Sequence, residues 1–527
     1  MAATGNPVAR TRSKPIMPVC ARFRSLLVSA SLVACAWAAA GGTALAAQDA
    51  GALASQLPDM GNPANTSLTK ADEYQIGRMA IREMRDHNEI LDDPETADYI
   101  QQLGSRLSAQ ARADGDNYQY LIVREPAVNA EALPGGFICV NSGLILLTNS
   151  ESELASVMAH ETAHVRQRHI ARGLQAQSRA SLASVAAMLA AVLVGAAGGN
   201  GQAMMGGIAM GQGIALQQMM NFTRDEEAEA DRVGIGYLAE AGFNAAAMPA
   251  FFEQLGRIEG VSDNGPLEML RNHPVTRERI AETRTRAAQY VGNKVTESNL
   301  YRWMRERVRV ESADASTDVT IYYARLRDRR ALSDAERYGE ALAQLRQNRP
   351  REAVATLRSL LAANPEMTTL YASLGQALMA ADQSSEALAL FDNALQLFPR
   401  NVPISLRYAD ALLAAGKARQ AHELLLDLFN NVPPTPSQIR LTALAASAAG
   451  DTGDAYYYMS EYHLSGGNLA LANQQLDLAL AAPNLTSVQR QRFRARQQEI
   501  RGWMREQQME RRGGPQQQFA LNSLGVS

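Results

Sequence analysis

Two hydrophobic periodicities divide the chain. In the first half, apolar residues recur every three or four positions over long stretches, and short alternating stretches interrupt them. The pattern predicts helices that begin at Thr69 and at Pro94, a strand over Tyr118–Val123, and a second strand region in the apolar run Phe137–Leu147. From about Leu332 the periodicity is helical throughout. We therefore predict a mainly helical α+β fold in which a small sheet is confined to the first half.

The strongest chemical signal lies in the helix predicted over Glu151–His169. It contains the motif H-E-x-x-H as His160, Glu161 and His164. Histidines four positions apart lie on one face of a helix, so their imidazoles can bind a single Zn²⁺, with Glu161 close enough to act on a metal-bound water. His169 follows five positions after His164, which turns it to another face and places it outside the predicted site. A solvated helix that carries the motif by coincidence is the alternative.

A catalytic zinc ion needs a third protein ligand and an open fourth position. An acidic helix that starts near Asn221 can supply this ligand from either of two i, i+4 pairs, Asp225 with Glu229 or Glu227 with Asp231. In such a pair one carboxylate can bind the metal while the other accepts the free N–H of a ligand histidine. The spacing does not choose between the pairs, and a solvated acidic helix start is the alternative.

Two further histidines lie in this half of the chain. His273 is a candidate either to stabilise the oxyanion or to occupy the open metal position, and the following Pro274 is well placed to open a helix. A capping or surface role for His273 is the alternative. His87 lies in the charged stretch Arg85–His87 and is predicted to be a solvated surface residue.

A glycine pair separates two of the predicted strands. Gly135 and Gly136, after Pro134, either form a plain hairpin turn or let another backbone approach closely. A free sheet edge beside the metal can accept an extended peptide as an additional strand, held by main-chain hydrogen bonds.

The N-terminal residues have the pattern of an export signal. A basic stretch precedes the apolar run Leu26–Ala40, and Ala44–Ala46 is a small-x-small cleavage site. Lipidation of Cys35 is the alternative. Cleavage after Ala46 leaves Cys139 as the single cysteine, so no internal disulfide is expected. The net charge of -3 gives no indication of nucleic-acid binding.

A long uncharged segment lies between Arg179 and Arg224. Its apolar run Ala180–Ala197 is long enough to span a membrane, but it is mostly alanine and lacks an aromatic belt. We predict a helical hairpin over Ala180–Met220 that packs near the active site or makes peripheral contact with a membrane or a partner.

The second half repeats with a period of 34 residues. The middle unit carries the packing residues of a tetratricopeptide repeat at Leu374, Gly375, Phe391 and Ala394. Such units stack into an α-solenoid with a concave surface that can bind a peptide or a partner protein. The repeated positions are Pro365, Pro399 and Pro433; Ala353, Ala387 and Ala421; and the turn residues Asn348, Asp382 and Gly416.

The repeat is less regular after Pro433. Asp454–Pro483 is predicted to be a further helix pair out of the 34-residue phase, and Thr486–Gln508 a capping helix. The predicted divisions of the chain are a signal peptide (1–46), a flexible lead-in (47–68), a zinc metallopeptidase domain (69–311), a connector (312–331), a tetratricopeptide-repeat domain (332–508) and a disordered tail (509–527).

Four motifs together resemble the zinc metallopeptidase family of the CAAX prenyl endopeptidases: Leu133–Gly136, H-E-x-x-H, Glu227–Asp231 and His273-Pro274. With its repeats and export signal, the chain looks like the soluble periplasmic branch of that family, the β-barrel assembly-enhancing proteases. The resemblance covers most of the mature chain. It departs from the family at Glu131, where many relatives carry an aromatic residue, and this leaves the local substrate contacts open.

The resemblance implies a zincin-like fold and a ligand set for one Zn²⁺ per chain. It implies that His160, His164 and Glu227 bind the metal, that Asp231 supports a ligand, and that His273 lies near the metal. In the predicted mechanism zinc activates a water molecule and polarises the scissile carbonyl, and Glu161 passes the water's proton to the leaving amine.

The resemblance also implies a task in the periplasm. This task is quality control of outer-membrane β-barrel proteins, by degrading stalled ones and assisting others, in contact with the β-barrel assembly machinery through the repeats. Two other functions stay open: a chaperone or adaptor with a vestigial metal site, and a membrane-embedded protease that uses Ala180–Ala197 as a span.

Overall fold

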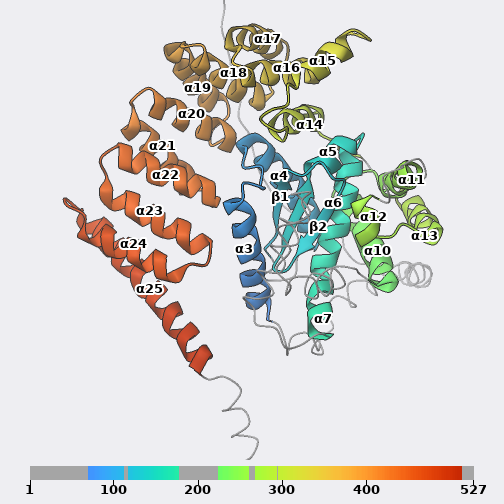
Figure 1. Ribbon diagram of the computed structural model, residues 1–527, viewed down its shortest axis with the longest axis horizontal. Helices are drawn as coiled ribbons and strands as arrows, with labels where there is room; N and C mark the ends of the chain where they lie inside the picture. Colours follow the sequence, from blue (N-terminus) through green and yellow to red (C-terminus); the bar gives the residue numbers. More distant parts are fainter. Residues whose placement is uncertain (1–68, 112–116, 177–222, 260–266, 293–294, 513–527) are drawn as a thin grey trace, which may run out of the picture. The chain divides into compact units, whose positions relative to one another are not determined.

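The computed structural model describes residues 69–111, 117–176, 223–259, 267–292 and 295–512, which belong to one compact unit (Figure 1). The predicted export signal, the lead-in, the Ala180–Met220 segment and residues from 513 onward lie outside the described residues. Among the helices that the structure describes, none is both long and apolar enough to span a bilayer.

A three-stranded sheet lies at the centre of the first half, as the alternating stretches predict. Strand β1 (Gln119–Val123) pairs in parallel with β3 (Phe137–Asn141), and β3 pairs antiparallel with β2 (Ala130–Leu133). The order β1-β3-β2 makes β2 an edge strand.

The glycine pair between β2 and β3 meets both predictions made for it. Gly135 and Gly136 turn the chain at φ values of +81° and +91°, which other residues rarely adopt. A Cβ added to Gly135 would lie 2.3 Å from the Cα of Tyr74, and one added to Gly136 would lie 2.0 Å from the carbonyl oxygen of Asn117. The pair therefore forms a hairpin turn and also admits two other backbone segments.

The prediction that the apolar run Phe137–Leu147 is extended throughout was wrong in its second half. Strand β3 ends at Asn141, and helix α5 (Ser142–Leu147) follows. Gly143 permits this change of direction, because a Cβ there would lie 2.0 Å from the carbonyl oxygen of Pro126. Both segments are apolar because both are buried, so hydrophobicity alone does not distinguish them.

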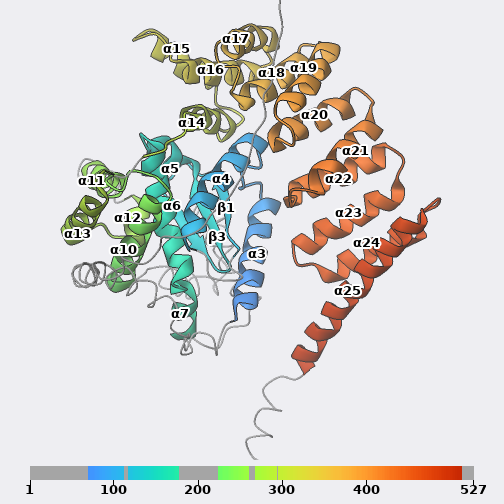
Figure 2. The same cartoon turned by 180° about the vertical axis from the view of Figure 1, so that it is seen from behind.

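Helices cover both faces of the sheet, as its continuous apolar strands require (Figures 1 and 2). Helix α3 (Lys70–Asp86) begins with a capping box between Thr69 and Asp72, and α4 begins at the predicted Pro94 and ends at Ala111. Alternate strand residues form two clusters: Val123, Leu133, Phe137 and Cys139 pack with Ile76, Ile81 and Met84 of α3, and Tyr120, Ile122, Ile138 and Val140 pack with Ile100, Leu103 and Leu107 of α4.

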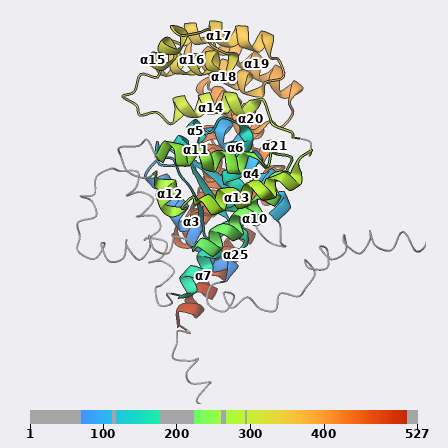
Figure 3. The same cartoon turned by 90° about the vertical axis from the view of Figure 1, so that its right-hand side faces the viewer.

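The remaining helices of the first half surround the second cluster, except α7, whose Ala171 packs in the first. Helix α6 (Glu151–Arg166) packs against α4 and α10, and α13 packs against α10, as the side view shows (Figure 3). The other bounds are α7 (His169–Ala176), α10 (Arg224–Glu240), α11 (Ala247–Glu259), α12 (Glu268–Asn272), α13 (Arg277–Ala287), the 3-10 turn η2 (Ala288–Tyr290), α14 (Leu300–Glu311) and α15 (Thr320–Arg327).

Pro274 does not open a helix, contrary to the prediction. Helix α12 ends at Asn272 with His273 as its C-cap, and α13 begins three residues after Pro274, at Arg277. The hydroxyl of Thr276 accepts a hydrogen bond from the backbone N–H of Arg279 and caps α13. His273 therefore lies between two helices.

The second half is a stack of helices in chain order, which confirms the tetratricopeptide repeats (Figure 2). Gly375 has the small-residue role expected of it, since a Cβ there would lie 2.1 Å from the ring of Phe391. The helices are α16 (Asp334–Arg346), α17 (Pro350–Ala363), α18 (Thr368–Ala380), α19 (Ser384–Leu397), α20 (Val402–Ala414), α21 (Ala418–Phe429), α22 (Pro436–Ala448), α23 (Thr452–Ser465), α24 (Leu469–Ala481) and α25 (Ser487–Arg512).

The 34-residue phase continues further than the sequence analysis predicted. The turn residues Asn348, Asp382, Gly416, Gly450 and Asn484 are each 34 positions apart, and all have positive φ, between 58° and 83°. The helix pairs are therefore α22 with α23 and α24 with α25, so the prediction of an out-of-phase pair over Asp454–Pro483 was wrong. The proline that recurs in the earlier units is replaced by Gly467, 34 positions after Pro433, which hid the period.

A buried ion-pair network links α4 to the helices of the second half. Asp93 and Glu95, at the start of α4, contact Arg307 of α14 and Arg407 of α20. The four side chains are between 1% and 14% exposed. This network holds the sheet-covering helix α4 and the repeats together.

Candidate metal centre

Helix α6 places two histidines side by side in the protein interior. It is capped by Ser150, whose hydroxyl accepts a hydrogen bond from the N–H of Glu153. The helix is buried on nearly all sides between α4, β2 and α10, so the polar residues of its motif cannot reach solvent. His160 and His164 are 2% and 0% exposed, and their Nε2 atoms lie 3.0 Å apart.

Glu227 and His273 complete a group of four buried donors. Glu227 Oε1 lies 3.4 Å from Nε2 of His164, and its Oε2 lies 3.5 Å from Nε2 of His160. His273 Nδ1 lies 2.8 Å from Glu227 Oε1 and 3.4 Å from Nε2 of His160. One donor atom from each residue lies within 4.8 Å of all the others.

The chemistry of this donor set fits a divalent cation. Three imidazole nitrogens and one carboxylate oxygen are ligands that zinc prefers. Burial opposes protonation of His160, but Asp231 and Glu227 outweigh it and raise its pKa to about 10, whereas burial lowers the pKa of His164 well below its ordinary value. One shared proton or one cation would satisfy nitrogens that face each other in this way.

A second row of polar residues orients the donors. Asp231 Oδ1 lies 2.9 Å from Nδ1 of His160. Arg279 donates to both carboxylate oxygens of Asp231 at 2.7 and 2.8 Å, and its Nη1 lies 2.6 Å from Glu227 Oε2. Its guanidinium also stacks over the ring of Phe252, at 5.0 Å from the centroid. Arg279 thereby holds the carboxylates of Asp231 and Glu227 in place beside His160.

Arg279 was missed by the sequence analysis. It lies on α13, six positions after His273, and four other arginines occur between residues 271 and 286. No spacing rule distinguishes it from these. Its burial, at 7% exposed in a strongly charged helix, becomes evident only from the packing of α13 on α10.

His169 lies outside the group of four donors, as predicted, but the prediction that it turns to another face was wrong. The prediction assumed that one continuous helix runs from His164 to His169. Instead α6 ends at Arg166, the chain turns at Arg168 with a φ of +54°, and a new helix, α7, begins at His169. His169 is buried, with Nδ1 2.8 Å from Nδ1 of His164 and Nε2 3.2 Å from Oε2 of Glu229. It therefore contacts a donor without joining the group of four.

The structure distinguishes the two carboxylate pairs that the spacing alone could not, because they face different neighbours. Glu229 faces His169 and Arg172, and Asp225 is exposed. Glu227 and Asp231, one helical turn apart, face the histidines of α6. His87, as predicted, is a surface residue, with a side chain 48% exposed.

Glu161 lies beside the donors without belonging to them. It is fully buried, and its Oε2 accepts a hydrogen bond of 3.0 Å from the backbone N–H of Ala132 in β2. Its Oε1 has no hydrogen-bond partner among the described residues and lies 3.6 Å from Nε2 of His273. Burial raises its pKa, which makes this carboxylate a stronger base than one in water.

The edge of the sheet adjoins this carboxylate, and a cavity adjoins His164. The cavity, of about 380 Å³, is lined by His164, Leu133 and Pro134 and by residues of α3 and α7. Glu131 of β2 accepts hydrogen bonds from the side-chain amides of Asn129 and Asn272, at 2.7 and 3.1 Å, and burial raises its pKa to about 7.

A second cluster of possible ligands lies among the repeats, and one of its carboxylates is already paired with an arginine. His422, Asp451 and Asp454 lie close together, but Arg492 forms an ion pair with Asp454. The side-chain amide of Gln489 donates to both aspartates. This cluster is therefore a salt-bridged helix contact, unlike the group around His160.

Comparisons with known proteins agree with this geometry. A model of peptidase family M48 matches residues 94–287, which include all four donors, and a tetratricopeptide repeat model matches residues 378–447. The β-barrel assembly-enhancing protease of Escherichia coli (strain K12) is 32% identical over 456 residues, which cover 85% of this chain and 92% of that protein.

Two other relatives match shorter parts. A Vibrio cholerae serotype O1 protein is 38% identical over 293 residues, covering 55% of this chain and 60% of its own length. The metalloprotease LoiP of Escherichia coli (strain K12) is 29% identical over 222 residues, covering 42% of this chain and 82% of its own. On its site, its family match and its whole-length relative, this chain belongs to peptidase family M48 and is a metalloendopeptidase that carries tetratricopeptide repeats.

Proposed function

We propose that this protein is an exported, zinc-dependent endopeptidase of the periplasm that acts in quality control and assembly of outer-membrane β-barrel proteins. The observation that carries the chemistry is the convergence of four buried donors beside Oε1 of Glu161, which has no hydrogen-bond partner in the described part of the chain. The substrate class rests on the name of the Escherichia coli relative and on an alignment that covers 92% of that protein.

In this proposal His160, His164 and Glu227 bind one zinc ion, and Glu161 transfers the proton of the attacking water. Bound zinc supplies Lewis acidity, which polarises a carbonyl and makes water a stronger nucleophile near neutral pH. Glu161 Oε1 accepts a proton from the attacking water and then delivers it to the leaving amine. The hydrogen bond from Ala132 holds the other oxygen of Glu161 and so fixes the direction of Oε1.

Asp231 and Arg279 act as positioning residues. Asp231 favours the tautomer of His160 in which Nδ1 carries the proton, which leaves Nε2 free to bind a cation. Arg279 holds Asp231 through two parallel hydrogen bonds.

Substrate is proposed to bind as an extra strand along the free edge of β2. The backbone N–H of Ala132 already points away from β3 toward Glu161, so a peptide on this edge lies next to the proton acceptor. Main-chain pairing depends little on sequence, which suits the degradation of varied unfolded proteins. The repeats are proposed to dock such substrates or the β-barrel assembly machinery.

Metal removal provides the direct test of this function. Treatment with a chelator should abolish cleavage of an unfolded outer-membrane protein, and one equivalent of zinc per chain should restore it. Thermal unfolding should shift upward with zinc, since a ligand at about 100 times its dissociation constant stabilises the folded state by about 2.7 kcal/mol. Metal content and fragment formation are measured on the same samples.

Full cleavage by metal-free protein would exclude the proposal. If the metal-free protein does not cleave but still prevents aggregation of the same substrate, a chaperone activity of the repeats exists beside the protease. A protein that binds no metal and only prevents aggregation would be the chaperone or adaptor with a vestigial site.

His273 is proposed to occupy the fourth metal position and to keep the enzyme latent. Its Nδ1 lies within the donor group, whereas its Nε2 lies 3.6 Å from Glu161. Changing His273 to alanine should raise kcat, by about tenfold if the closed form accounts for roughly 90% of molecules. The rate is measured with zinc-loaded protein on a peptide substrate.

His87→Ala provides the matched control, because His87 is exposed and has no role in the proposed site. A large loss of activity in His273→Ala, with zinc content and unfolding temperature unchanged, would instead assign His273 to the oxyanion.

A further inference from the structure

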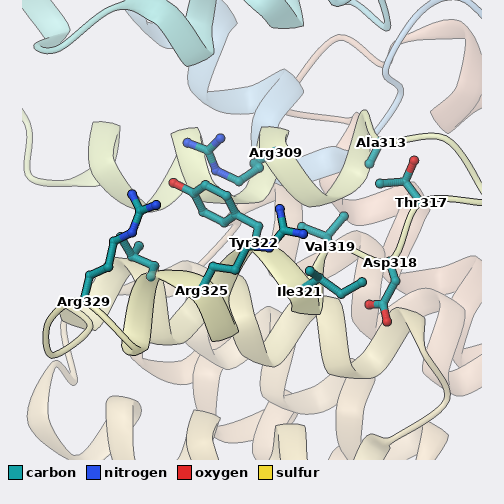
Figure 4. Close-up of a pocket in the computed structure, with 10 residues that line it drawn as sticks. Arg309, Ala313, Thr317, Asp318, Val319, Ile321, Tyr322, Arg325 and Arg329 are labelled. Carbon is teal, nitrogen blue, oxygen red and sulfur yellow. The ribbon is translucent and has the colours of Figure 1, made fainter.

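A groove of about 550 Å³ lies between helix α14 and the short helix α15, away from the metal centre (Figure 4). Tyr323 anchors α15, since it is fully buried and its hydroxyl donates to Oε2 of Glu306 at 2.9 Å. The two preceding residues face outward: Ile321 is 49% exposed and Tyr322 is 40% exposed. The groove therefore presents apolar side chains that no described part of the chain covers.

Arginines lie along the same groove. Arg309 pairs with Glu306 at 3.0 Å and stacks over the ring of Tyr322, at 4.4 Å from its centroid. Arg325 and Arg329 also line the groove, and Figure 4 shows Arg329 toward one end of it. Neither of these two forms an ion pair with any residue that the structure describes.

The neighbouring arginines differ in this respect. Arg327 pairs with Glu340, and Arg330 pairs with Glu336 at 2.6 Å. Both of these arginines point out of the groove, toward helix α16. The one carboxylate that lines the groove, that of Asp318, accepts hydrogen bonds from the N–H and hydroxyl of Thr320, the first residue of α15. Positive charge without a partner is thus concentrated where the apolar side chains are exposed.

We propose that this groove binds an extended acidic segment of a partner protein. An aliphatic or aromatic residue of the segment packs on Ile321 and Tyr322, and two of its carboxylates pair with Arg325 and Arg329. Arg325 lies in the last turn of α15, and Arg329 lies in the turn that follows the end of this helix at Arg327. An extended peptide can present two carboxylates from one side, because side chains at alternate positions lie on the same side, roughly 7 Å apart.

A protein partner fits these features better than nucleic acid. The groove offers two unpaired arginines and an apolar lining, whereas nucleic-acid sites carry a continuous basic surface with many phosphate contacts. The inference is independent of the metal centre, because it predicts binding and not cleavage.

The test measures binding by the full mature chain in a Glu161→Gln background, so that cleavage cannot consume the probe. The probe is a fluorescein-labelled peptide with the core Leu-Glu-Tyr-Glu-Leu, and its binding is measured by fluorescence anisotropy. A second peptide with glutamine in place of both glutamates serves as the uncharged comparison. The charge reversal Arg325→Glu with Arg329→Glu should weaken binding of the acidic peptide by about tenfold or more, because two attractive contacts become repulsive. The glutamine peptide should bind weakly to both proteins.

The matched control reverses Arg351 and Arg419, which are also exposed on repeat helices. It should bind the acidic peptide within about twofold of the parent, because surface charges away from a site contribute little. All variants should unfold at the parent temperature, since neither pair of arginines forms an ion pair with the residues that the structure describes.

Equal binding of the acidic and glutamine peptides, or unchanged binding after the Arg325 and Arg329 reversal, would overturn the proposal. So would a reversal that abolishes binding to vesicles of phosphatidylglycerol while peptide binding stays the same, because the groove would then recognise an anionic lipid surface.

Discussion

Replacing Glu161 with glutamine should abolish peptide-bond cleavage while leaving the fold and the zinc content unchanged. Glutamine has the same shape, and its carbonyl oxygen can still accept the hydrogen bond that Ala132 donates to Glu161. It cannot accept a proton at neutral pH, so the general-base contribution to kcat, about 10²- to 10⁴-fold, should be lost. The measurement is kcat on an unfolded substrate, with metal content and unfolding temperature determined on the same protein.

Glu153→Gln is the matched control. Glu153 lies on the same helix, two turns before Glu161, and its carboxylate accepts a 2.7 Å hydrogen bond from the N–H of Asn149 that glutamine can also accept. This variant should keep wild-type kcat. Normal turnover by the Glu161 variant would remove that residue from proton transfer. Loss of zinc in the Glu161 variant would make it a structural residue and leave its catalytic role without support.

The sequence was sufficient for features that local rules determine. Thr69 and Pro94 mark helix starts that the structure confirms. The approach of His160 to His164 follows from the helical period alone, since both lie on one uninterrupted helix. The repeats were evident because packing imposes the same small residues every 34 positions.

The features that were missed depend on changes of chain direction or on contacts between distant elements. His169 returns to the site because Arg168 adopts a positive φ, which a non-glycine sequence does not signal. Arg279 and Asp231 meet because α13 packs on α10. Spacing alone left Glu227 and Asp225 open, and the family resemblance favoured Glu227; the packing of α10 on α6 turns Glu227 toward the two histidines. Local patterns therefore gave the motif residues, and tertiary contacts gave their neighbours.

Replacing Arg307 with methionine should lower the free energy of unfolding by about 3–5 kcal/mol, because it leaves buried carboxylates with half of their positive charge. Arg307 is 1% exposed and donates to both oxygens of Asp93, at 2.6 and 2.7 Å. It also donates to the hydroxyls of Tyr338 and Ser373 on repeat helices. Chemical denaturation of the zinc-loaded protein measures the loss.

The exposed ion pair between Arg349 and Glu352 provides a matched comparison for Arg307→Met. Arg349 lies 3.6 Å from Glu352, and both side chains are more than 40% exposed. Arg349→Met should cost at most about 1 kcal/mol, because solvent screens the pair. A similar small cost for Arg307→Met would show that the buried network is not a determinant of stability.

The loss of stability in Arg307→Met should come from the unbalanced negative charge that remains, and not from the loss of one side chain. Adding Asp93→Asn to Arg307→Met leaves Arg407 with Glu95, and asparagine can still accept the hydrogen bond from the N–H of Thr96. The double variant should therefore recover about 1–3 kcal/mol relative to Arg307→Met. A double variant less stable than the single one would show that the hydrogen bonds, and not the charges, carry the energy.

Acid titration of the same proteins gives the sign of the electrostatic contribution. Burial by itself raises the pKa of Asp93, but the charge and hydrogen bonds of Arg307, with Arg407 and Thr96, hold that pKa well below its ordinary value. Asp93 therefore contributes stability that is fully present above the unfolded pKa of about 3.9 and is lost as pH falls toward the folded pKa. The stability difference between the wild type and Arg307→Met should be largest near pH 7 and shrink on acidification, because protonation removes the negative charge that Arg307 balances. A difference that grows on acidification would contradict a stabilising, ionised Asp93 in the folded protein.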